Sequence, residues 1–552
     1  MRIVGLSNSH DAGYCVLEDG KIIEHIEIER YNRLKETYGD SLKYFRENYL
    51  AKNNLTLEDV DAWVAPLPAS GLSKAANEVY DTYDYIKEED VNFYAHHFCH
   101  AAHAFYSSPF KDSYILTIDS EGTEEDGLVA STRGWIASEN EIISLFQIPH
   151  TTFSLGKLWG RCTRYIFKLS AGYPRGHQAG SVMAMAALGD SKKYYDDFHK
   201  MATHDFPHVF PAAPGAKRGV YVPPEEDAIH PYLHKYRMIG EQSEQELFNM
   251  AASLQAVTED FILKELVPMV EHKALQYLGF KSDNICFSGG VSLNSVSMGK
   301  VKGATSKNVF IPPVPYDGGN SIGACQHYWH GVLGNEKKSD VFVSPYLGEA
   351  YDENDVRKAI EKNKDELEIF EDVNLEECVD HLVNGKIIAI FNGRSESGRR
   401  ALGNRSILAN PAISDMKEQI NEKVKHRQWY RPFAPSILEE HGSDWFEYFF
   451  PSPYMSFVFK IRDEKFGLAP AIEHFDATAR AHSVSKEQNS DYYDIIKMFY
   501  DKTGVPLILN TSFNDREPIC ETPNDAINCF LGTEIDYLYF VNENILVKKN
   551  AL

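Results

Sequence analysis

The chain has 552 residues, of which 43% are hydrophobic and 25% are charged, which predicts a globular protein of more than one domain and excludes a disordered chain. Its 56 Lys and Arg residues against 80 Asp and Glu residues give a formal net charge of -24, which opposes bulk binding to nucleic-acid phosphates. No apolar run approaches the roughly 18 residues of a membrane span. The eight cysteines form no Cys-x-x-Cys pair, and the first residues form no apolar leader. We therefore expect a soluble, cytoplasmic protein with reduced thiols and neither a membrane nor a bulk nucleic-acid partner.

The first residues predict a three-stranded meander, with strands at residues 2–6, up to Leu17 and up to about Ile28. Its first turn carries His10 and Asp11. A small-residue turn of this kind presents backbone N–H groups to an anion, although a plain hairpin is the commoner meaning of the pattern. The basic segment that follows contains Lys35, and taken alone it is typical of the solvated start of a helix.

Two histidines stand four residues apart ahead of an apolar strand. His96 and His100 lie in a helix-forming segment, so both imidazoles point from one face, and the strand 114–119 ends in Asp119. Two histidines and a carboxylate can hold a divalent metal with positions left open, and Asp317, again just past an apolar run, is a further candidate ligand. The alternative is a helix with surface or core histidines.

A second strand, 285–287, leads into paired glycines, Gly289 and Gly290, and then a helix. Glycines after a strand let the backbone approach a ligand closely, and Asn294 at the helix start could fix a base or ribose. A structural glycine turn is the alternative meaning. The pattern recurs at Asp317-Gly318-Gly319. Residues 203–240 lack clear periodicity and are expected to be an insertion that carries specificity.

The second half begins with a polar segment, 346–372, that we expect to be a linker with an early helix. A strand at 386–391 then leads into a loop rich in small and basic residues. A guanidinium group can donate two parallel hydrogen bonds to a phosphate or a carboxylate, whereas a lysine supplies a compact point charge. We therefore expect two anions to bind close together at this loop. A solvated basic face is the alternative. The basic residues in question are Arg400, Arg405, Lys425, Arg431 and Arg480.

These motifs together resemble the nodulation and antibiotic carbamoyltransferase family, and the resemblance spans nearly the whole chain. It implies an α/β protein: an actin-like ATPase-fold domain of two duplicated α/β subdomains at residues 1–345, the linker 346–372, and a smaller YrdC-like α+β domain at residues 373–552. The first domain is similar to the tRNA threonylcarbamoyl-transferase module, in which two histidines and two aspartates hold an iron ion against the nucleotide phosphate.

The resemblance implies a reaction in two stages. Carbamoyl phosphate and ATP, with Mg²⁺, would give carbamoyl adenylate and pyrophosphate in the second domain, and the first domain would transfer the carbamoyl group to a hydroxyl of a small molecule. A homodimer is compatible with the family. The implied metal ligands, for Fe²⁺ or another divalent ion, are His96, His100, Asp119 and Asp317. The implied catalytic residues are His10, as base or orienter, with Lys35, Arg400 and Lys425. The implied substrate-binding residues are Gly289, Gly290, Asn294, Gly318, Arg405, Arg431, Met455, Arg480, Asn510 and Ser512.

The chain departs from the family pattern at several positions, which include Ser397-Gly398-Arg399, Ser120 and Ser181. Two other classes remain as alternatives. One is tRNA modification of the threonylcarbamoyl type, which the net charge opposes, and the other is a non-enzymatic nucleotide sensor with the ATPase fold. A hydrogenase-maturation carbamoyltransferase would carry paired Cys-x-x-Cys motifs and the reverse domain order.

Overall fold

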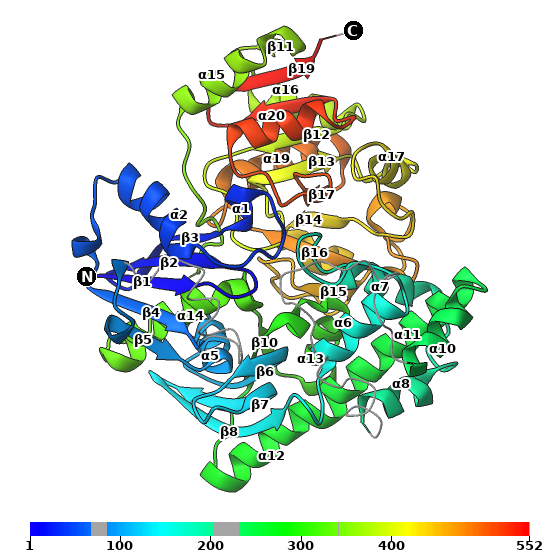
Figure 1. The fold of residues 1–552 in the computed structure, drawn as a ribbon. Coiled ribbons are helices and arrows are strands. Elements are labelled where there is room, and N and C mark those ends of the chain that lie inside the picture. Colours follow the sequence, from blue (N-terminus) through cyan, green and yellow to red (C-terminus); the bar gives the residue numbers. More distant parts are fainter. Residues whose placement is uncertain (68–84, 204–230, 340–341, 551–552) are drawn as a thin grey trace. The chain divides into compact units, whose positions relative to one another are not determined.

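A computed structural model describes residues 1–67, 85–203, 231–339 and 342–550 (Figure 1). The chain divides into two compact units, residues 1–343 and 344–552. Most of the insertion expected at 203–240 lies outside the described residues.

The first unit begins with a five-stranded sheet of β1 (Arg2–Ser7), β2 (Gly13–Glu18), β3 (Lys21–Glu27), β4 (Ala62–Pro66) and β5 (Val91–Tyr94). The strand order is β3-β2-β1-β4-β5. The first three strands form the antiparallel meander that the sequence predicts, and β4 and β5 then add in parallel. The short helices α1 (Glu29–Asn32) and α2 (Ser41–Tyr44) follow β3.

The second sheet repeats this connectivity. It contains β6 (Asp112–Thr123), β7 (Val129–Ser138), β8 (Glu141–Pro149), β9 (Asn284–Ser288) and β10 (Asn308–Phe310) in the order β10-β9-β6-β7-β8. Again three strands form an antiparallel meander and two more add in parallel. One α/β plan used twice is the duplicated, actin-like ATPase fold that was expected for this part of the chain.

Two helices join the sheets. α5 (His96–Tyr106) packs on β6, β7 and β9, whereas α14 (Asn320–His327) packs on β1, β2 and β4, and the two helices pack on each other. They cross so closely that a Cβ atom on Gly323 would overlap the carbonyl oxygen of Cys99. This close approach brings the start of α5 next to the turn before α14, where Asp317 lies.

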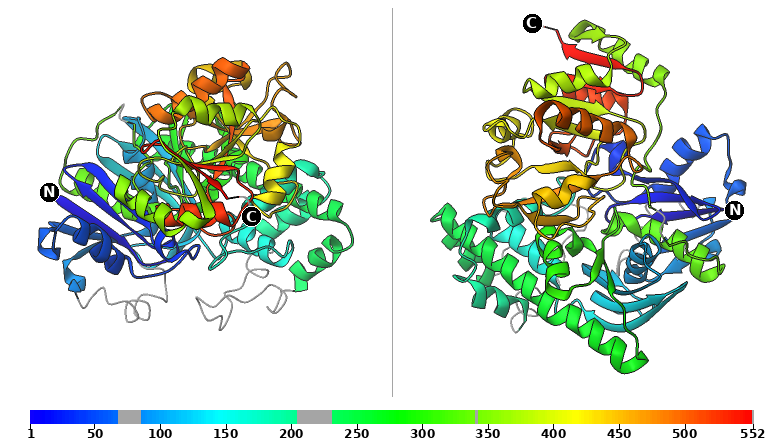
Figure 2. Two further views of the ribbon diagram at one scale, coloured as in Figure 1. Left: turned by 90° about the horizontal axis from the view of Figure 1, so that it is seen from above. Right: turned by 180° about the vertical axis from the view of Figure 1, so that it is seen from behind.

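A group of helices, drawn in cyan to green, packs together on one side of the first unit (Figure 2). Ser154 caps the first of them by accepting the N–H of Lys157 at 3.1 Å. The helices are α6 (Leu155–Tyr165), α7 (Ala179–Met185), α8 (Tyr195–Ala202), α10 (Pro231–Gly240) and α11 (Glu244–Asp260). α12 (Val267–Leu278) follows and packs on β6, β7 and β8. α13 (Ser295–Thr305) follows the glycine turn after β9.

The second unit is built on a mixed nine-stranded sheet with the order β11-β19-β18-β12-β13-β17-β14-β16-β15. Its core includes Ile390, Ile496, Phe499 and Ile508, all completely buried. The strands are β11 (Leu367–Phe370), β12 (Ile388–Phe391), β13 (Arg405–Ala409), β14 (Ala434–Leu438), β15 (Phe457–Lys460), β16 (Thr478–Val484), β17 (Leu507–Ser512), β18 (Tyr537–Phe540) and β19 (Ile545–Lys549). The helices are α15 (Glu353–Lys362), α16 (Leu375–Val383), α17 (Met416–Lys423), α18 (Gly442–Trp445), α19 (Ser490–Thr503) and α20 (Pro523–Leu531).

The segment 346–372, expected to be a linker, belongs to the second unit. β11 pairs antiparallel with β19, and α15 packs on α20. The charged residues of this segment face solvent, while Val356, Ala359 and Ile360 are buried at helical spacing. Because most of its residues are polar, the composition alone suggested a linker.

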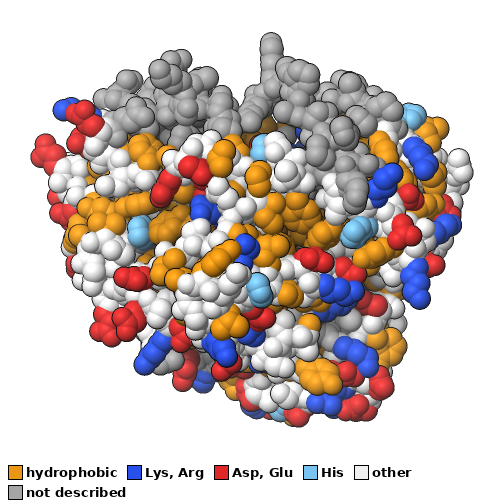
Figure 3. All heavy atoms as spheres, turned by 90° about the horizontal axis from the view of Figure 1, so that it is seen from below, with side chains coloured by type: hydrophobic (Ala, Val, Ile, Leu, Met, Phe, Trp, Pro, Cys, Tyr) orange, Lys and Arg blue, Asp and Glu red, His pale blue; other side chains and the backbone are white. Residues whose placement is uncertain are grey.

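On the face drawn in Figure 3, Lys and Arg side chains are interspersed with Asp and Glu side chains among the described residues. In the part of the chain that the structure describes, no helix is long and apolar enough to cross a membrane.

Candidate functional site

The four residues expected to bind a metal converge in the first unit. Their nearest ligand atoms, two imidazole nitrogens and two carboxylate oxygens, all lie within 4.8 Å of one another. The Nε2 atoms of His96 and His100 are 3.2 Å apart. His100 Nε2 lies 3.1 Å from Asp119 Oδ2 and 3.3 Å from Asp317 Oδ1. His96 Nε2 lies 3.6 Å and 3.4 Å from the same two oxygens.

Neighbouring groups orient two of these ligands. The Ser288 hydroxyl donates to the carbonyl of Pro315 at 2.9 Å, so it accepts from Nδ1 of His100, 3.3 Å away. Nδ1 of His100 therefore carries a proton, and Nε2, the nitrogen that would bind a metal, points into the cluster. Oδ1 of Asp119 accepts the N–H of Ser120 at 2.6 Å, which leaves Oδ2 for the cluster.

The electrostatics of the cluster call for a positive charge. Burial opposes protonation of His100, but its hydrogen bonds to Asp119 and Asp317 outweigh burial and raise the pKa of His100 to about 9. Burial likewise opposes ionisation of Asp119, yet His100 and His96 hold the pKa of Asp119 well below its usual range. The two carboxylates must be balanced by extra protons or by a cation. Two imidazoles and two carboxylates fit a divalent metal such as Fe²⁺.

The other histidines of α5 are structural. His97 donates from Nε2 to the carbonyl of Ala130 at 3.1 Å and accepts from the Thr117 hydroxyl at 2.9 Å. Burial, followed by the charges of His96 and His100, keeps the pKa of His97 well below its usual range. Burial lowers the pKa of His103 to about 3, and its Nδ1 contacts Gln326. Both imidazoles are therefore neutral packing groups.

The glycine turns border this cluster of histidines and aspartates. Gly289 has a φ of +89°, and a Cβ atom there would overlap the backbone of Ile118, so only glycine fits. A Cβ on Gly290 would lie 3.3 Å from Oδ1 of Asp119, and the carbonyl of Gly318 lies 2.8 Å from Nε2 of His25. Backbone therefore lines the cluster on these sides.

Asn294 has a local role in the structure. Its Oδ1 caps α13 by accepting the N–H of Ser297 at 3.1 Å, and its Nδ2 donates to Gln255 at 2.9 Å. The side chain that was expected to reach a base or ribose therefore already has partners within the fold.

His10 belongs to a second polar cluster of the first unit, and Lys35 directly precedes Glu36, a member of that cluster. His10 Nδ1 is 2.8 Å from Asp11 Oδ2, and its Nε2 is 3.2 Å from Glu36 Oε2. Burial lowers the pKa of His10, but the two carboxylates outweigh it and raise this pKa well above the usual range. Without a bound cation, a histidine in that state keeps its proton at neutral pH, which suits an orienting role better than the role of a base. The Lys35 side chain lies against Gly176.

In the second unit, Arg405 holds the loop that precedes it. All five of its N–H groups donate to backbone carbonyls, those of Asn392, Gly393, Asn404 and Glu521, at 2.9–3.4 Å. Its guanidinium stacks on Phe391, 3.5 Å from the ring centre. Arg405 was expected to bind a substrate directly, but its donors are used by the fold.

A buried carboxylate, which the sequence did not single out, organises the same loop. Oε1 of Glu396 accepts the N–H groups of Leu402, Asn404 and Arg405 at 2.7, 2.8 and 3.1 Å. Asn510 ties this loop to β14, because its Nδ2 donates to Ala401 O and to Ser436 Oγ, both at 2.9 Å.

Lys425 is buried against the end of β17. Its Nζ donates to Ser512 O at 2.8 Å and to Asn514 O and Oδ1 at 2.6 and 2.7 Å. The Ser512 hydroxyl donates to the same Asn514 Oδ1 at 2.7 Å. Met455 is buried with a φ of +55°, a strained conformation of the kind that occurs at binding sites.

The other basic residues form an arginine cluster, Arg400, Arg427, Arg431 and Arg480. Burial and the charges of Arg400 and Arg431 hold the pKa of Arg480 well below its usual range. Burial and the charges of Arg431 and Arg480 do the same to Arg427. Among the described residues, no carboxylate forms an ion pair with Arg427, Arg431 or Arg480, and Nε of Arg480 is buried without a hydrogen-bond partner. The sequence motif contained Arg427, but its membership of the cluster became evident only in the fold.

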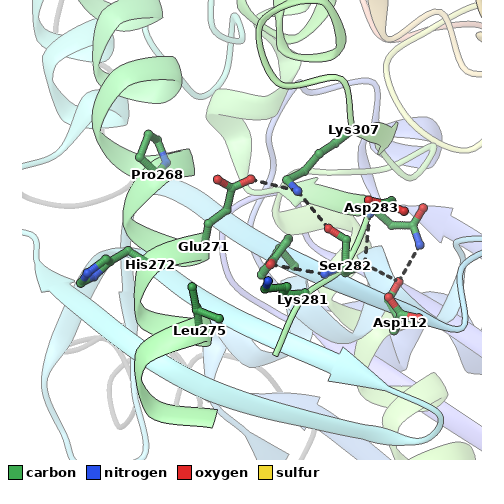
Figure 4. A pocket seen from close by; sticks show the side chains of 11 residues that line it. Asp112, Pro268, Glu271, His272, Leu275, Lys281, Ser282, Asp283 and Lys307 are labelled. Carbon is green, nitrogen blue, oxygen red and sulfur yellow. Dashed lines mark hydrogen bonds and ion pairs between the residues drawn. The ribbon is translucent and has the colours of Figure 1, made fainter. Parts of the chain in front are cut away.

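A cavity of about 680 Å³ in the first unit lies elsewhere, between α12, the first residues of β6 and β9, and the segments that precede β9 and β10 (Figure 4). The ammonium of Lys307 in it pairs with Glu271 at 3.0 Å and donates to the carbonyl of Ser282 at 2.9 Å. None of the predicted site residues lines this cavity.

Fold and site define a class: an α/β enzyme whose first unit is a duplicated ATPase-type fold with a cluster of two histidines and two aspartates, and whose second unit holds a basic cluster. The family model for the carbamoyltransferase N-terminus matches residues 70–326, and the model for the carbamoyltransferase C-terminus matches residues 379–549. The chain belongs to the carbamoyltransferase family and is a carbamoyltransferase.

Two similar proteins support the same family assignment. Nodulation protein NolNO of Sinorhizobium fredii is 32% identical, with 98% of this chain and 79% of that protein covered. Nodulation protein NolO of Bradyrhizobium diazoefficiens is 33% identical, with 80% of this chain and 77% of that protein covered. Among solved structures, full-length HypF in its phosphate- and nucleotide-bound form shares 14% identity over 60% of this chain and 56% of that chain. Its TM-score of 0.34 is too low to bear on the fold.

Proposed function

We propose that this carbamoyltransferase is ATP-dependent and transfers the carbamoyl group through carbamoyl adenylate to a hydroxyl of a small molecule. In the first stage, carbamoyl phosphate, water and ATP give carbamoyl adenylate, pyrophosphate and phosphate. In the second stage, the acceptor oxygen bonds to the carbamoyl carbon, the bond from that carbon to the AMP oxygen breaks, and the acceptor proton is lost.

The observation that carries the first stage is the arginine cluster. Burial and like-charged neighbours hold down the pKa of Arg427 and of Arg480, and among the described residues neither they nor Arg431 form an ion pair with a carboxylate, so a polyanion would complete this site. ATP and carbamoyl phosphate repel each other, and Arg400, Arg431 and Arg480 would neutralise them as they approach. Arg427, fixed by Asn421 Oδ1 at 2.7 Å, extends the positive surface.

The surrounding residues would shape this anion site. Lys425 donates hydrogen bonds to Ser512 and Asn514 and so fixes the end of β17. The loop that carries Arg400 is held by Arg405, Glu396 and Asn510. We assign Lys425 and Arg405 to positioning of this site. Met455, in its left-handed conformation, would turn the chain toward a nucleotide.

For the second stage, His96, His100, Asp119 and Asp317 would hold Fe²⁺ or a related ion, which supplies Lewis acidity toward a phosphate when bound. Ser288 fixes the tautomer of His100. The backbone at Gly289 and Gly290 would border a ligand held beside the cluster, and Asn294 keeps that turn in place. His10 and Lys35 would orient the acceptor.

The alternatives predict different partners. A tRNA-modifying enzyme needs a surface for an RNA backbone, which the net charge of -24 does not favour. A nucleotide sensor would bind ATP without consuming carbamoyl phosphate.

The test incubates the full-length protein with ATP, carbamoyl phosphate, Mg²⁺ and a library of hydroxylated small molecules, and seeks the mass gain of one carbamoyl group. The proposal predicts product only when both co-substrates are present. Product that forms equally without ATP would contradict it.

A further inference from the structure

A second group of metal-ligand atoms lies in the first unit, outside the ligand set already described. It comprises His10 from the turn after β1, Glu36 from the loop after α1, and His177 from the loop before α7. One ligand atom from each lies within 4.8 Å of the others. Three separate segments thus bring two imidazoles and one carboxylate to one point.

Glu36 is held so that one carboxylate oxygen serves both imidazoles. Its Oε1 accepts the backbone N–H of His177 at 2.7 Å. Its Oε2 then lies 3.2 Å from Nε2 of His10 and 2.7 Å from Nδ1 of His177. The carboxylate is 1% exposed, and the residue has a φ of +57°, a left-handed conformation that a glutamate adopts only when its surroundings impose it.

The supporting contacts are those of a metal site. His10 directs Nδ1 to Asp11 Oδ2 at 2.8 Å, so the carboxylate would fix the imidazole with Nε2 as the ligand atom. Asp11 is buried and also left-handed, with a φ of +57°. The backbone N–H of Glu36 donates to Glu29 at 2.8 Å, which anchors the loop. His10 and His177 are 28% and 35% exposed, so an ion and a further ligand have access.

We propose that His10, Glu36 and His177 form a second divalent-metal site, of the two-histidine, one-carboxylate kind that takes zinc or iron with coordination positions left open. This site shares no ligand with the His96 cluster, and its existence does not depend on the proposed reaction. Tyr38 lies beside it, with its ring centroid 5.9 Å from that of His10.

The test counts metal. The full-length protein is stripped with a chelator and dialysed against Zn²⁺, and bound zinc is measured by elemental analysis. The proposal predicts two zinc ions per chain for the wild type, one for His177→Ala, one for His100→Ala and none for the double variant. His177 is partly exposed, so its removal leaves the core intact, and Glu36→Gln gives a second reading of the same site.

A surface control and a graded variant sharpen the result. His272→Ala, at the cavity of Figure 4, should keep both ions. Asp11→Asn should weaken binding at the second site by about 10- to 100-fold while the His96 cluster is unaffected. Cobalt in the His100→Ala variant should give a visible spectrum that His177→Ala removes.

One zinc ion in the wild type that His100→Ala loses and His177→Ala retains would overturn the proposal, and so would two ions that both survive His177→Ala. An ordinary hydrogen-bonded triad with a protonated His10 gives the first of these results. None of these measurements uses carbamoyl transfer, so failure of the second site and failure of the proposed function are distinguishable.

Discussion

In the first unit, hydrogen bonds distinguish the histidines of α5 that are proposed to bind a metal from those that only pack in the core. Four histidines fall within eight positions of α5, and their spacing alone predicts only that His96 and His100 share a face. Ser288 explains why Nε2 of His100 points into the cluster, and Ala130 explains why His97 does not take part. The first prediction follows from this difference.

His100→Ala should lose the metal of the first cluster and the carbamoylated product, yet still release pyrophosphate from ATP when carbamoyl phosphate is present. The physical reason is that the arginine cluster of the second unit contains none of these ligands. Elemental analysis and separate assays of pyrophosphate and product check this result. His97→Gln is the matched control from the same helix and should keep the first metal. Loss of both activities in a folded, metal-free variant would count against the division into two stages.

The arginines of the second unit also differ in their hydrogen bonds: the donors of Arg405 are used by the fold, whereas Nε of Arg480 is buried without a partner among the described residues. Arg480 has like-charged neighbours, so Arg480→Gln should raise or leave unchanged the melting temperature without ligand, while it lowers pyrophosphate formation about 100-fold or more. Arg405→Gln should do the opposite: it leaves buried carbonyls without donors and lowers the free energy of unfolding by at least about 2 kcal/mol. Thermal melts with and without ATP, beside the pyrophosphate assay, distinguish these outcomes. A large loss of ligand-free stability in Arg480→Gln would refute the anion-site interpretation.

At the scale of elements, the crossing of α5 and α14 positions the four proposed metal ligands of the His96 cluster. Gly323→Ala should force the helices apart at Cys99, at a cost of about 1–3 kcal/mol, and weaken metal binding. Gly303→Ala, in α13 with no atom within 4 Å of the added Cβ, is the matched control and should be neutral or stabilising by up to about 1 kcal/mol. Denaturant unfolding and metal titration measure both effects. Equal metal affinity in the two variants would show that the crossing does not set the cluster geometry.

The sequence predicted the elements whose patterns are local. The meander of β1–β3 and the apolar part of β6 before Asp119 have clear patterns, although β6 continues to Thr123 and does not end at Asp119 as predicted. The repeated strand-and-turn pattern led to Asp317. The segment 346–372 was misjudged because three of the four residues of β11 are exposed, and its place in the sheet depends on β19, over 170 residues later. Likewise, the sequence around Glu36 or His177 does not predict their contact, because it joins two loops that are 141 positions apart in the chain.

At the scale of the whole molecule, buried neutral histidines make stability depend on pH. Burial lowers the pKa of His482 in β16 to about 3, and its Nδ1 lies 2.9 Å from Ser436 Oγ. An unfolded histidine has a pKa of about 6.5, so between these values the unfolded chain binds more protons and stability falls as pH falls. His482→Gln should reduce this slope by up to about 1.4 kcal/mol per pH unit in that window. Urea unfolding between pH 7 and pH 5, followed by hydrogen exchange of β16, measures the slope, and an unchanged slope would contradict the assignment.

The central claim is that this carbamoyltransferase activates its carbamoyl donor with ATP. Its most direct test is the release of pyrophosphate by the full-length protein, measured with ATP alone, with carbamoyl phosphate alone and with both. The account predicts pyrophosphate only with both, in amounts that follow the consumption of carbamoyl phosphate. Release of ADP and phosphate in place of AMP and pyrophosphate, or pyrophosphate formed without carbamoyl phosphate, would contradict it.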